Sequence, residues 1–505
     1  MTAAPHIAVV GAGLSGLAAA ARLRGRGYEV TVFESGSAPG GLVRTETIDG
    51  HRFDTGATVL TMPGLIVDAL GALGLSADDA RERLALRPID PGYVMNYADG
   101  SSLAFPHDPD AIPDAVAAAF GPAAGRGTRD LLDWLRQVYD AEFDVFIDRN
   151  YRGLRDLAAA PTRRSAAALL RLGTLGGLTG AVSRFVDDER VQRAFTFQAL
   201  YAGVPPERAR AIYAIIADMD LGRGLSYPAG GMGRIGRVLA DAVTDAGVTV
   251  AYDTPVTAID TAGRRATGVR AAGRTMAADA VVVTTERDRA AQLLGARSRR
   301  RLRYSPSAVV VHGVIDPAVA GRWRSGHHTL DFGAAWRQTF AELTRRPGRR
   351  MTDGSYLLTR AALSDPETFV TGGLESVSVL APTPNLATAP IDWDTETDAY
   401  TGEVLTTLAG RGYPGLDGMR VLRVDTPATW LRDGLPAGTP FSAAHTLSQT
   451  GPLRTANVWP GLDNLFLAGS ATVPGVGIPP VLISGKLAAE RVIERLPAPR
   501  REPVR

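Results

Sequence analysis

The clearest indication of a fold comes from residues 7–34, IAVVGAGLSGLAAAARLRGRGYEVTVFE. Residues 7–11 form an apolar run that predicts a buried β-strand, and residues 28–33 predict a second strand. Between them, residues 14–26 are rich in alanine and leucine and predict an α-helix. A strand, a glycine turn, a helix and a strand in this order form a βαβ unit, which predicts a parallel sheet.

The turn of this unit, GAGLSG, carries the spacing G-x-G-x-x-G. Gly11 permits a tight turn, Gly13 lets a pyrophosphate approach the backbone, and Gly16 lets the helix pack closely on the strand. The free backbone amides at the start of the helix, around Ala12 and Ser15, would then face the phosphate charge. The motif therefore predicts a dinucleotide site.

Glu34 supports this interpretation because it ends the second predicted strand, 21 residues beyond Gly13. A carboxylate at this position can hold the ribose hydroxyls of a dinucleotide. It would repel a phosphorylated ribose, which argues against NADP as the ligand. We therefore predict a Rossmann-type domain in an α/β protein.

The composition excludes several classes of function. The chain has 505 residues and predicts roughly two or three domains, and a net charge of +2 gives no reason to expect nucleic acid as a partner. Without cysteine it can form no disulfide, thiolate nucleophile or cysteinyl bond to a cofactor, and a cytoplasmic protein is the simplest expectation. The neighbours His327 and His328 have no acid at metal-ligand spacing, so we expect no metal.

Residues 163–185 form an apolar segment that is interrupted by Arg171 and flanked by arginines. One interpretation is a buried pair of helices joined by a glycine turn. The other is a segment that rests in a membrane interface, with its arginines reaching the lipid headgroups. We expect no membrane-spanning helix, since no window of about 18 uninterrupted apolar residues occurs.

Strand-like segments recur at the start, middle and end of the chain, around a long helical stretch. This pattern predicts two domains, each built from separated pieces. The first, the dinucleotide-binding domain, takes residues 1–90, 221–300 and 426–497. The second, a mixed α+β substrate domain that includes the helical insertion, takes residues 91–220 and 301–425.

Residues 36–60, GSAPGGLVRTETIDGHRFDTGATVL, resemble the second signature of a flavoprotein superfamily that includes amine oxidases and carotenoid desaturases. The resemblance implies that the dinucleotide is FAD. Family members usually have arginine after the glycine pair, whereas this chain has Leu42 after Gly41 and its arginine at Arg44. Which of the two side chains meets the phosphates stays open. Thr58 closes the FDTGAT part of the signature and is also expected at the cofactor.

Further segments narrow the resemblance. In DTPVTAID, a valine like Val256 meets the adenine through its backbone in this superfamily. The segments FTFQALYAGVPP, YSPSAVVVHGVI, HHTLDFGAAW and GTPFSAAHTLSQTGPLR resemble, in the same order, those of the bacterial phytoene desaturase family. The resemblance implies an FAD-dependent enzyme that oxidises 15-cis-phytoene stepwise by hydride transfer to the flavin, towards neurosporene or lycopene. It also implies a helical insertion that faces the membrane.

The segment GSATVPGVGIPPVLISGK, residues 469–486, is the most informative part of this resemblance. In the family, Gly469 and Ser470 follow the last strand, and Gly477 and Ile478 lie where the backbone meets the isoalloxazine ring. Glycine allows a close approach and proline fixes the loop. An apolar lining of this kind suits a hydrocarbon substrate.

Acid-base residues are harder to identify. GLRDLAAAP resembles a family segment whose arginine–aspartate pair implies a catalytic role for Arg155 and Asp156, although a helix cap is an alternative role for Asp156. Phe195, Phe197 and Tyr201 fit either a substrate tunnel or an ordinary core. His445 is expected to be structural.

The expected partners are phytoene and other hydrophobic polyenes, with a quinone or oxygen as electron acceptor. No second dinucleotide fingerprint, cysteine pair or cluster motif suggests another acceptor. Because quinones and phytoene reside in the bilayer, we expect the protein to associate peripherally with a membrane surface. The alternatives are a related carotenoid desaturase, ketolase or saturase, a flavin amine oxidase or protoporphyrinogen oxidase, and a Rab-escort-type protein that binds prenyl groups without redox chemistry.

Overall fold

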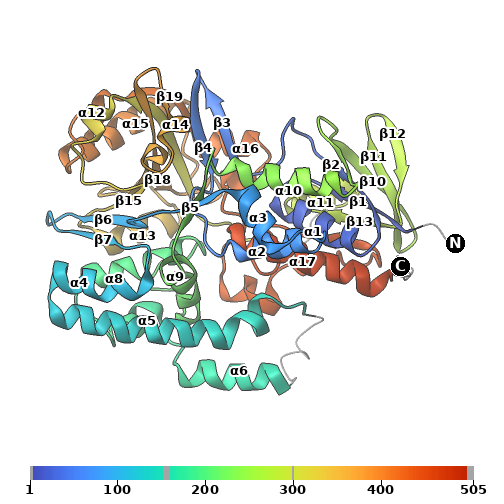
Figure 1. Cartoon of the computed structure of the whole chain (residues 1–505), viewed down its shortest axis with the longest axis horizontal. Coiled ribbons are helices and arrows are strands. Elements are labelled where there is room, and N and C mark those ends of the chain that lie inside the picture. Colours follow the sequence, from blue (N-terminus) through green and yellow to red (C-terminus); the bar gives the residue numbers. More distant parts are fainter. Residues whose placement is uncertain (1–3, 152–159, 298–300, 498–505) are drawn as a thin grey trace.

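The computed structural model describes residues 4–151, 160–297 and 301–497. Figure 1 shows a sheet with covering helices near the two termini, a second and larger sheet away from them, and a group of helices along one edge. Arg155 and Asp156, the predicted catalytic pair, lie outside the described residues.

The first sheet is parallel and has five strands in the order β20-β13-β1-β2-β9. Its strands are β1 (His6–Val10), β2 (Glu29–Phe33), β9 (Thr249–Ala251), β13 (Ala280–Val283) and β20 (Leu465–Leu467). β1 and β2 pair in parallel register on either side of α1 (Leu14–Gly25) in the chain, which confirms the predicted βαβ unit.

Several helices pack on this sheet or on the helices and strands beside it. They are α1, α2 (Gly64–Gly71), α3 (Ala77–Leu84), α10 (Gly233–Asp245), α11 (Arg287–Leu293) and α17 (Ile478–Arg495). α17 crosses α1 so closely that a Cβ built on Gly485 would lie 2.2 Å from the Ser15 carbonyl oxygen. Only glycine fits at this crossing, which holds the middle of α17 against the start of α1.

Small antiparallel units flank the parallel sheet. They are the hairpin β3 (Val43–Ile48) with β4 (His51–Gly56), the pair β5 (Leu86–Pro88) with β8 (Ser226–Pro228), and the three-stranded sheet β10 (Val256–Ala262), β11 (Arg265–Ala271) and β12 (Arg274–Ala277).

The second sheet has eight strands in the order β19-β14-β18-β16-β15-β6-β7, with β17 paired to β18. The strands are β6 (Tyr93–Tyr97), β7 (Ser102–Phe105), β14 (Ser307–Ile315), β15 (His328–Phe332), β16 (Tyr356–Thr359), β17 (Val370–Thr371), β18 (Leu374–Thr383) and β19 (Arg420–Asp425). Its helices are α12 (Pro317–Ala320), α13 (Trp336–Thr344), α14 (Pro366–Phe369), α15 (Trp393–Gly410) and α16 (Pro427–Arg432).

Helices dominate residues 112–221, as predicted. They are α4 (Ile112–Phe120), α5 (Pro122–Glu142), a π-helical turn (Phe143–Ile147), α6 (Ala160–Arg171), α7 (Leu178–Val182), α8 (Glu189–Ala194) and α9 (Ala214–Leu221). α6 lies below α5 at the edge of the molecule (Figure 1). Within the described ranges, no helix has both the length and the apolar character needed to span a bilayer.

Residues 163–185 form the two helices and glycine turn of the first interpretation, but the expectation that this pair is buried is wrong, since most of its residues are partly or fully exposed. α6 and α7 are separated by a turn that contains Gly173, Gly176 and Gly177. Leu169 and Leu178 are buried in this pair, but Leu170 and Leu175 are exposed.

The strands of the two sheets follow the ranges expected for two domains. Every strand of the parallel sheet falls within 1–90, 221–300 or 426–497, and every strand of the eight-stranded sheet within 91–220 or 301–425. Where one domain ends and the next begins stays a prediction.

Candidate cofactor and substrate cavity

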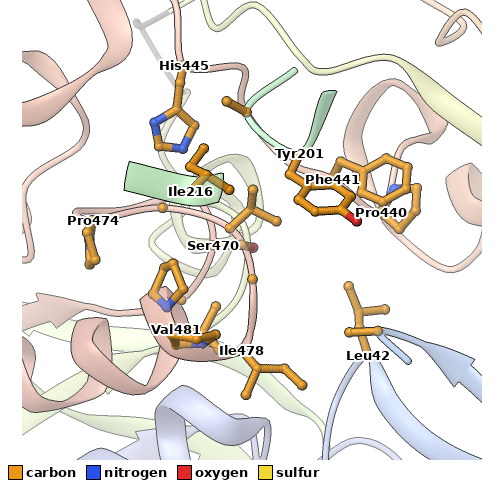
Figure 2. A pocket seen from close by; sticks show the side chains of 18 of the residues that line it. Leu42, Tyr201, Ile216, Pro440, Phe441, His445, Ser470, Pro474, Ile478 and Val481 are labelled. Carbon is orange, nitrogen blue, oxygen red and sulfur yellow. The ribbon is translucent and has the colours of Figure 1, made fainter. Parts of the chain in front are cut away.

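A cavity of about 1180 Å³ opens among the parallel sheet, one face of the eight-stranded sheet and helix α9. Ligand pockets are typically roughly 300–1,000 Å³. The cavity begins at the glycine turns near α1 and is bordered by the loop before α17. Figure 2 shows apolar side chains from these separate elements around one space.

Two glycine turns face each other at one part of the cavity wall. Gly13 and Gly40 form a parallel β-bridge, and a Cβ built on Gly41 would lie 3.1 Å from the Gly13 Cα. The first amides of α1, from Leu14 and Ser15 onward, have no intrahelical acceptor because they open the helix. Gly13, Ser15 and Gly41 line the cavity, as expected of residues that bind phosphate.

Gly11 and Gly16 support this turn from behind and do not line the cavity. Gly11 has φ +109°, and a Cβ there would lie 2.3 Å from Thr284 Oγ1. A Cβ on Gly16 would lie 2.1 Å from the Gly11 carbonyl oxygen. Both positions therefore require glycine for the reasons that the motif predicts.

Glu34 is buried where the second strand ends. Its Oε2 accepts a hydrogen bond of 2.7 Å from the Ala12 amide, and its Oε1 accepts one of 2.8 Å from the Gly36 amide. The Glu34 carbonyl accepts a hydrogen bond from the Thr254 amide, near Val256 at the start of β10. The contacts of Glu34 with ribose and of Val256 with adenine stay predictions.

Leu42 and Arg44 have different environments. Leu42 is 42% exposed, lines the cavity and points into it in Figure 2. Arg44 lies on β3 outside the cavity lining, with its Nη1 3.8 Å from Glu46 Oε1. The side chain that follows the glycine pair is thus an apolar wall of the cavity, and a role of Arg44 in binding FAD stays a prediction. Thr58 also lines the cavity.

The loop between β20 and α17 borders the cavity with Gly469, Ser470, Gly477 and Ile478. Gly469 and Gly477 have φ of +105° and +111°, a backbone conformation that favours glycine. The Gly469 amide donates a 3.0 Å hydrogen bond to Ser484 Oγ, which ties the loop to α17. Ile478 extends into the same space as Leu42 (Figure 2). The glycines of this segment leave its backbone free of side chains, as expected where it meets the isoalloxazine ring.

Besides Asp54 of the FDTGAT signature and the exposed Asp433, three acids line this cavity: Glu142, Asp220 and Glu286. Burial raises the pKa of each, to about 7 for Asp220, well above the usual range for Glu142, and upward for Glu286. Asp220 accepts hydrogen bonds from Tyr93 Oη at 2.9 Å and Gln198 Nε2 at 3.4 Å. Sequence reasoning missed all three acids.

A signal for Glu142 was present in the sequence. Leu131, Leu135, Val138 and Glu142 recur at helical spacing and are all buried on one face of α5. The acid thus continues an apolar stripe, a position where carboxylates are rare unless paired.

The aromatic residues divide between core and cavity. Phe195 and Phe197 are buried in the core outside the cavity lining, whereas Tyr201 lines the cavity. His445, expected to be structural, also faces the cavity (Figure 2), and burial lowers its pKa well below the usual range.

A buried histidine pair supports the cavity wall from outside. The rings of His327 and His328 lie 4.4 Å apart, and His328 Nε2 donates a 3.1 Å hydrogen bond to the Thr58 carbonyl. Burial lowers the pKa of His328 to about 4 and that of His327 well below its usual range. Both rings are therefore neutral at pH 7.

This pair predicts a loss of stability in mild acid. Below pH 6.5, unfolded His328 takes up a proton that the folded protein excludes until about pH 4, so the free energy of unfolding falls by roughly 1.4 kcal/mol per pH unit. In His328→Gln the amide can donate to the Thr58 carbonyl in place of the imidazole. Between pH 6.5 and 4.5 we expect the free energy of unfolding of this variant to fall by about 2–3 kcal/mol less than that of the wild type. Urea unfolding across this range measures the difference, and parallel pH profiles for the two proteins would contradict the assignment.

The cradle around Gly13 fits FAD. The space between its two facing glycine turns is open because neither turn carries a side chain there. The free amides at the start of α1 suit a pyrophosphate. An apolar space continues from this cradle to the Gly477–Ile478 loop, as a flavin ring requires.

Comparisons with known proteins agree with this geometry. The family described as flavin containing amine oxidoreductase matches residues 14–493. A phytoene dehydrogenase of Streptomyces griseus is 44% identical over 96% of this chain and 95% of its own length. A zeta-carotene-forming phytoene desaturase of Myxococcus xanthus is 31% identical over 97% of this chain and 94% of its own.

A solved oxidoreductase from Methanosarcina mazei shares the fold with a TM-score of 0.61 at 17% identity, covering 96% of this chain and all of its own. FAD as the cofactor and an oxidoreductase activity follow from the family match and from the relatives above. The chain belongs to the flavin-containing amine oxidoreductase family, within its group of bacterial phytoene desaturases.

Proposed function

We propose that this protein is an FAD-dependent carotenoid desaturase that oxidises 15-cis-phytoene stepwise towards neurosporene or lycopene. The observation that carries the proposal is the large apolar cavity that joins the FAD cradle to the Gly477–Ile478 loop. A hydrocarbon offers no polar group for recognition, so it must be bound through the shape of the cavity and the exclusion of water. FAD, when bound, supplies the acceptor for the hydride that desaturation removes.

The protein would act mainly by positioning. Leu42, Ile216, Phe441 and Ile478 point into the cavity from four different elements (Figure 2). Side chains of this kind exclude water and would hold an extended polyene with one of its bonds at the flavin ring. Near-attack geometry there lowers the barrier to hydride transfer. The acid-base role of Arg155 and Asp156 stays a prediction.

Expression in a bacterial host that accumulates phytoene tests this function. We expect a yellow neurosporene-like or red lycopene-like pigment on chromatography of the extract, and the product counts the desaturation steps. Colourless phytoene, with folded and FAD-loaded protein present, would contradict the proposal and favour a later carotenoid as substrate.

We also propose that the mouth of the cavity rests on a membrane surface and that a quinone or oxygen accepts the electrons. Leu175 and Leu447 are 62% and 66% exposed, yet both line the cavity. Leu170, at 59% exposure, belongs to the same helix pair as Leu175. Exposed apolar groups at a cavity entrance suit a bilayer from which a lipid substrate enters.

The double variant Leu175→Asp/Leu447→Asp tests the membrane contact. Burying one leucine in an apolar phase contributes roughly 1.5–3 kcal/mol, so we expect liposome binding to fall by more than about tenfold, with FAD content unchanged. The matched control Leu363→Asp/Leu431→Asp changes two leucines of 51% and 50% exposure outside the cavity lining and should bind liposomes normally. Equal binding by all three proteins in a flotation assay would contradict this contact.

A further inference from the structure

Glu142 is one of the acids in the cavity to which the proposed desaturation gives no task. It is 6% exposed and lines the cavity, and its Oε2 is buried without a hydrogen-bond partner among the described residues. An unpaired buried carboxyl costs free energy that an apolar side chain would avoid. Glu142 also lies directly before the π-helical turn Phe143–Ile147, and such turns occur frequently at functional sites.

Neighbouring groups leave Glu142 neutral. Burial is the cause of its raised pKa, with no described cation opposing it. Tyr213 is close enough for a Glu142 charge to raise the tyrosine pKa, but its hydroxyl lies 2.5 Å from the His445 carbonyl and 2.7 Å from Thr450 Oγ1. Because the Tyr213 hydroxyl donates its hydrogen bond to the His445 carbonyl, it donates none to Glu142. The carboxyl therefore keeps its own proton and offers it to the cavity.

The segment that carries Glu142 is attached to the helix of the flavin loop. Lys486, the single lysine of the chain, places its Nζ 2.6 Å from Asp148 Oδ2. Asn150 donates a 3.0 Å hydrogen bond to the Leu487 carbonyl. These contacts join the segment after the π-helical turn to the middle of α17, the helix that follows the predicted flavin-facing loop.

A neutral carboxyl in an apolar wall selects a particular ligand. It donates one hydrogen bond, and the matching acceptor in a hydrophobic molecule is a carbonyl oxygen. A hydrocarbon substrate carries none. A quinone is apolar, carries two carbonyl oxygens and can accept the two electrons that desaturation leaves on the cofactor.

We propose that Glu142 binds the carbonyl oxygen of a quinone-class electron acceptor and protonates it during reoxidation of the cofactor. The quinone receives a hydride equivalent, two electrons and one proton, from the reduced cofactor and one proton from Glu142. The products are the quinol, the oxidised cofactor and the Glu142 carboxylate, which regains its proton from solvent. This inference rests on the acceptor class proposed above and not on the identity of the polyene.

The oxidative half-reaction tests it directly. The purified FAD-loaded protein is reduced with dithionite under argon and mixed with ubiquinone-1, and the return of flavin absorbance is followed by stopped flow. General acid catalysis contributes typically about 10²–10⁴-fold, so we expect Glu142→Gln to slow reoxidation by quinone by at least about 100-fold. Reoxidation by oxygen and FAD content should match the wild type. Glu82→Gln, an exposed acid on α3, is the matched control and should change neither rate.

Glu142→Leu separates this role from a structural one. It restores an apolar wall and removes a buried carboxyl, so we expect a higher melting temperature together with weaker quinone binding in a fluorescence titration. A lower melting temperature with unchanged quinone binding would assign Glu142 to the fold and overturn the proposal.

Three further results would also overturn it. Quinone could reoxidise the reduced cofactor of Glu142→Gln at the wild-type rate. Alternatively, the variant could slow reoxidation by quinone and reoxidation by oxygen by the same factor. Glu142→Leu could slow reduction of the cofactor by phytoene alone, which would assign the acid to the substrate. Because dithionite reduces the cofactor in the main experiment, a failure of the desaturase proposal would not alter its outcome.

Discussion

Replacing Gly13 by valine is expected to give a folded protein that no longer retains FAD. Gly13 has φ −70°, which any residue adopts, and a Cβ there would meet only the Gly41 Cα at 3.8 Å, an ordinary contact. The valine methyl groups would instead fill the space between the two glycine turns, in front of the free amides of α1. We expect the Kd for FAD to rise at least about 100-fold, equivalent to roughly 2.7 kcal/mol.

Flavin absorbance of the purified protein and a titration of the apoprotein with FAD measure this effect. Gly64→Val is the control, since Gly64 opens α2 with nothing within 4 Å of a built Cβ. It should bind FAD like the wild type. Near-normal FAD content in the Gly13 variant would place the pyrophosphate elsewhere and contradict the cradle.

Replacing Glu375 by glutamine is expected to produce the largest loss of stability. Glu375 on β18 and Arg360, which follows β16, are each 4% exposed and pair through bonds of 2.7 and 2.9 Å. Removing one charge of a buried pair leaves the other uncompensated and costs about 3–5 kcal/mol. The Arg360 amide also donates to the His327 carbonyl, so the pair supports the strands behind the cavity.

Urea denaturation measures this loss. The matched control is Asp114→Asn, which breaks the pair of Asp114 with Arg129, whose side chains are 83% and 58% exposed. Exposed pairs contribute less than about 1 kcal/mol, so this control should unfold near the wild-type midpoint. A Glu375 variant that unfolds at the same midpoint as the control would contradict a structural role for the buried pair.

The glycine turn of the predicted FAD cradle was predictable because its rules are local. A strand, the spacing of Gly11, Gly13 and Gly16, and an acid at the end of the next strand specify one turn whatever the rest of the chain does. The helix pair within 163–185 was predictable for the same reason, since its glycines stand between two helix-forming runs. Its exposed leucines could not be identified from apolar character alone.

The apolar stripe of α5 marks Glu142 as an unusual acid, but no local pattern predicts that Glu142, Asp220 and Glu286 share one cavity. Glu142, Asp220 and Glu286 lie far apart in the chain and meet only because α5, α9 and the loop after β13 converge. Local sequence likewise could not choose between Leu42 and Arg44. The outcome depends on which face of the turn before β3 meets the cavity, and that is set by the packing of the hairpin.

Anaerobic mixing of the purified FAD-loaded protein with phytoene in liposomes tests whether phytoene itself reduces the bound FAD. We predict that phytoene bleaches the flavin absorbance without any added acceptor, and that chromatography finds a polyene with a longer conjugated system in proportion to the flavin reduced. Flavin that stays oxidised with phytoene but is bleached by a primary amine would contradict the account and assign the cavity to amine oxidation.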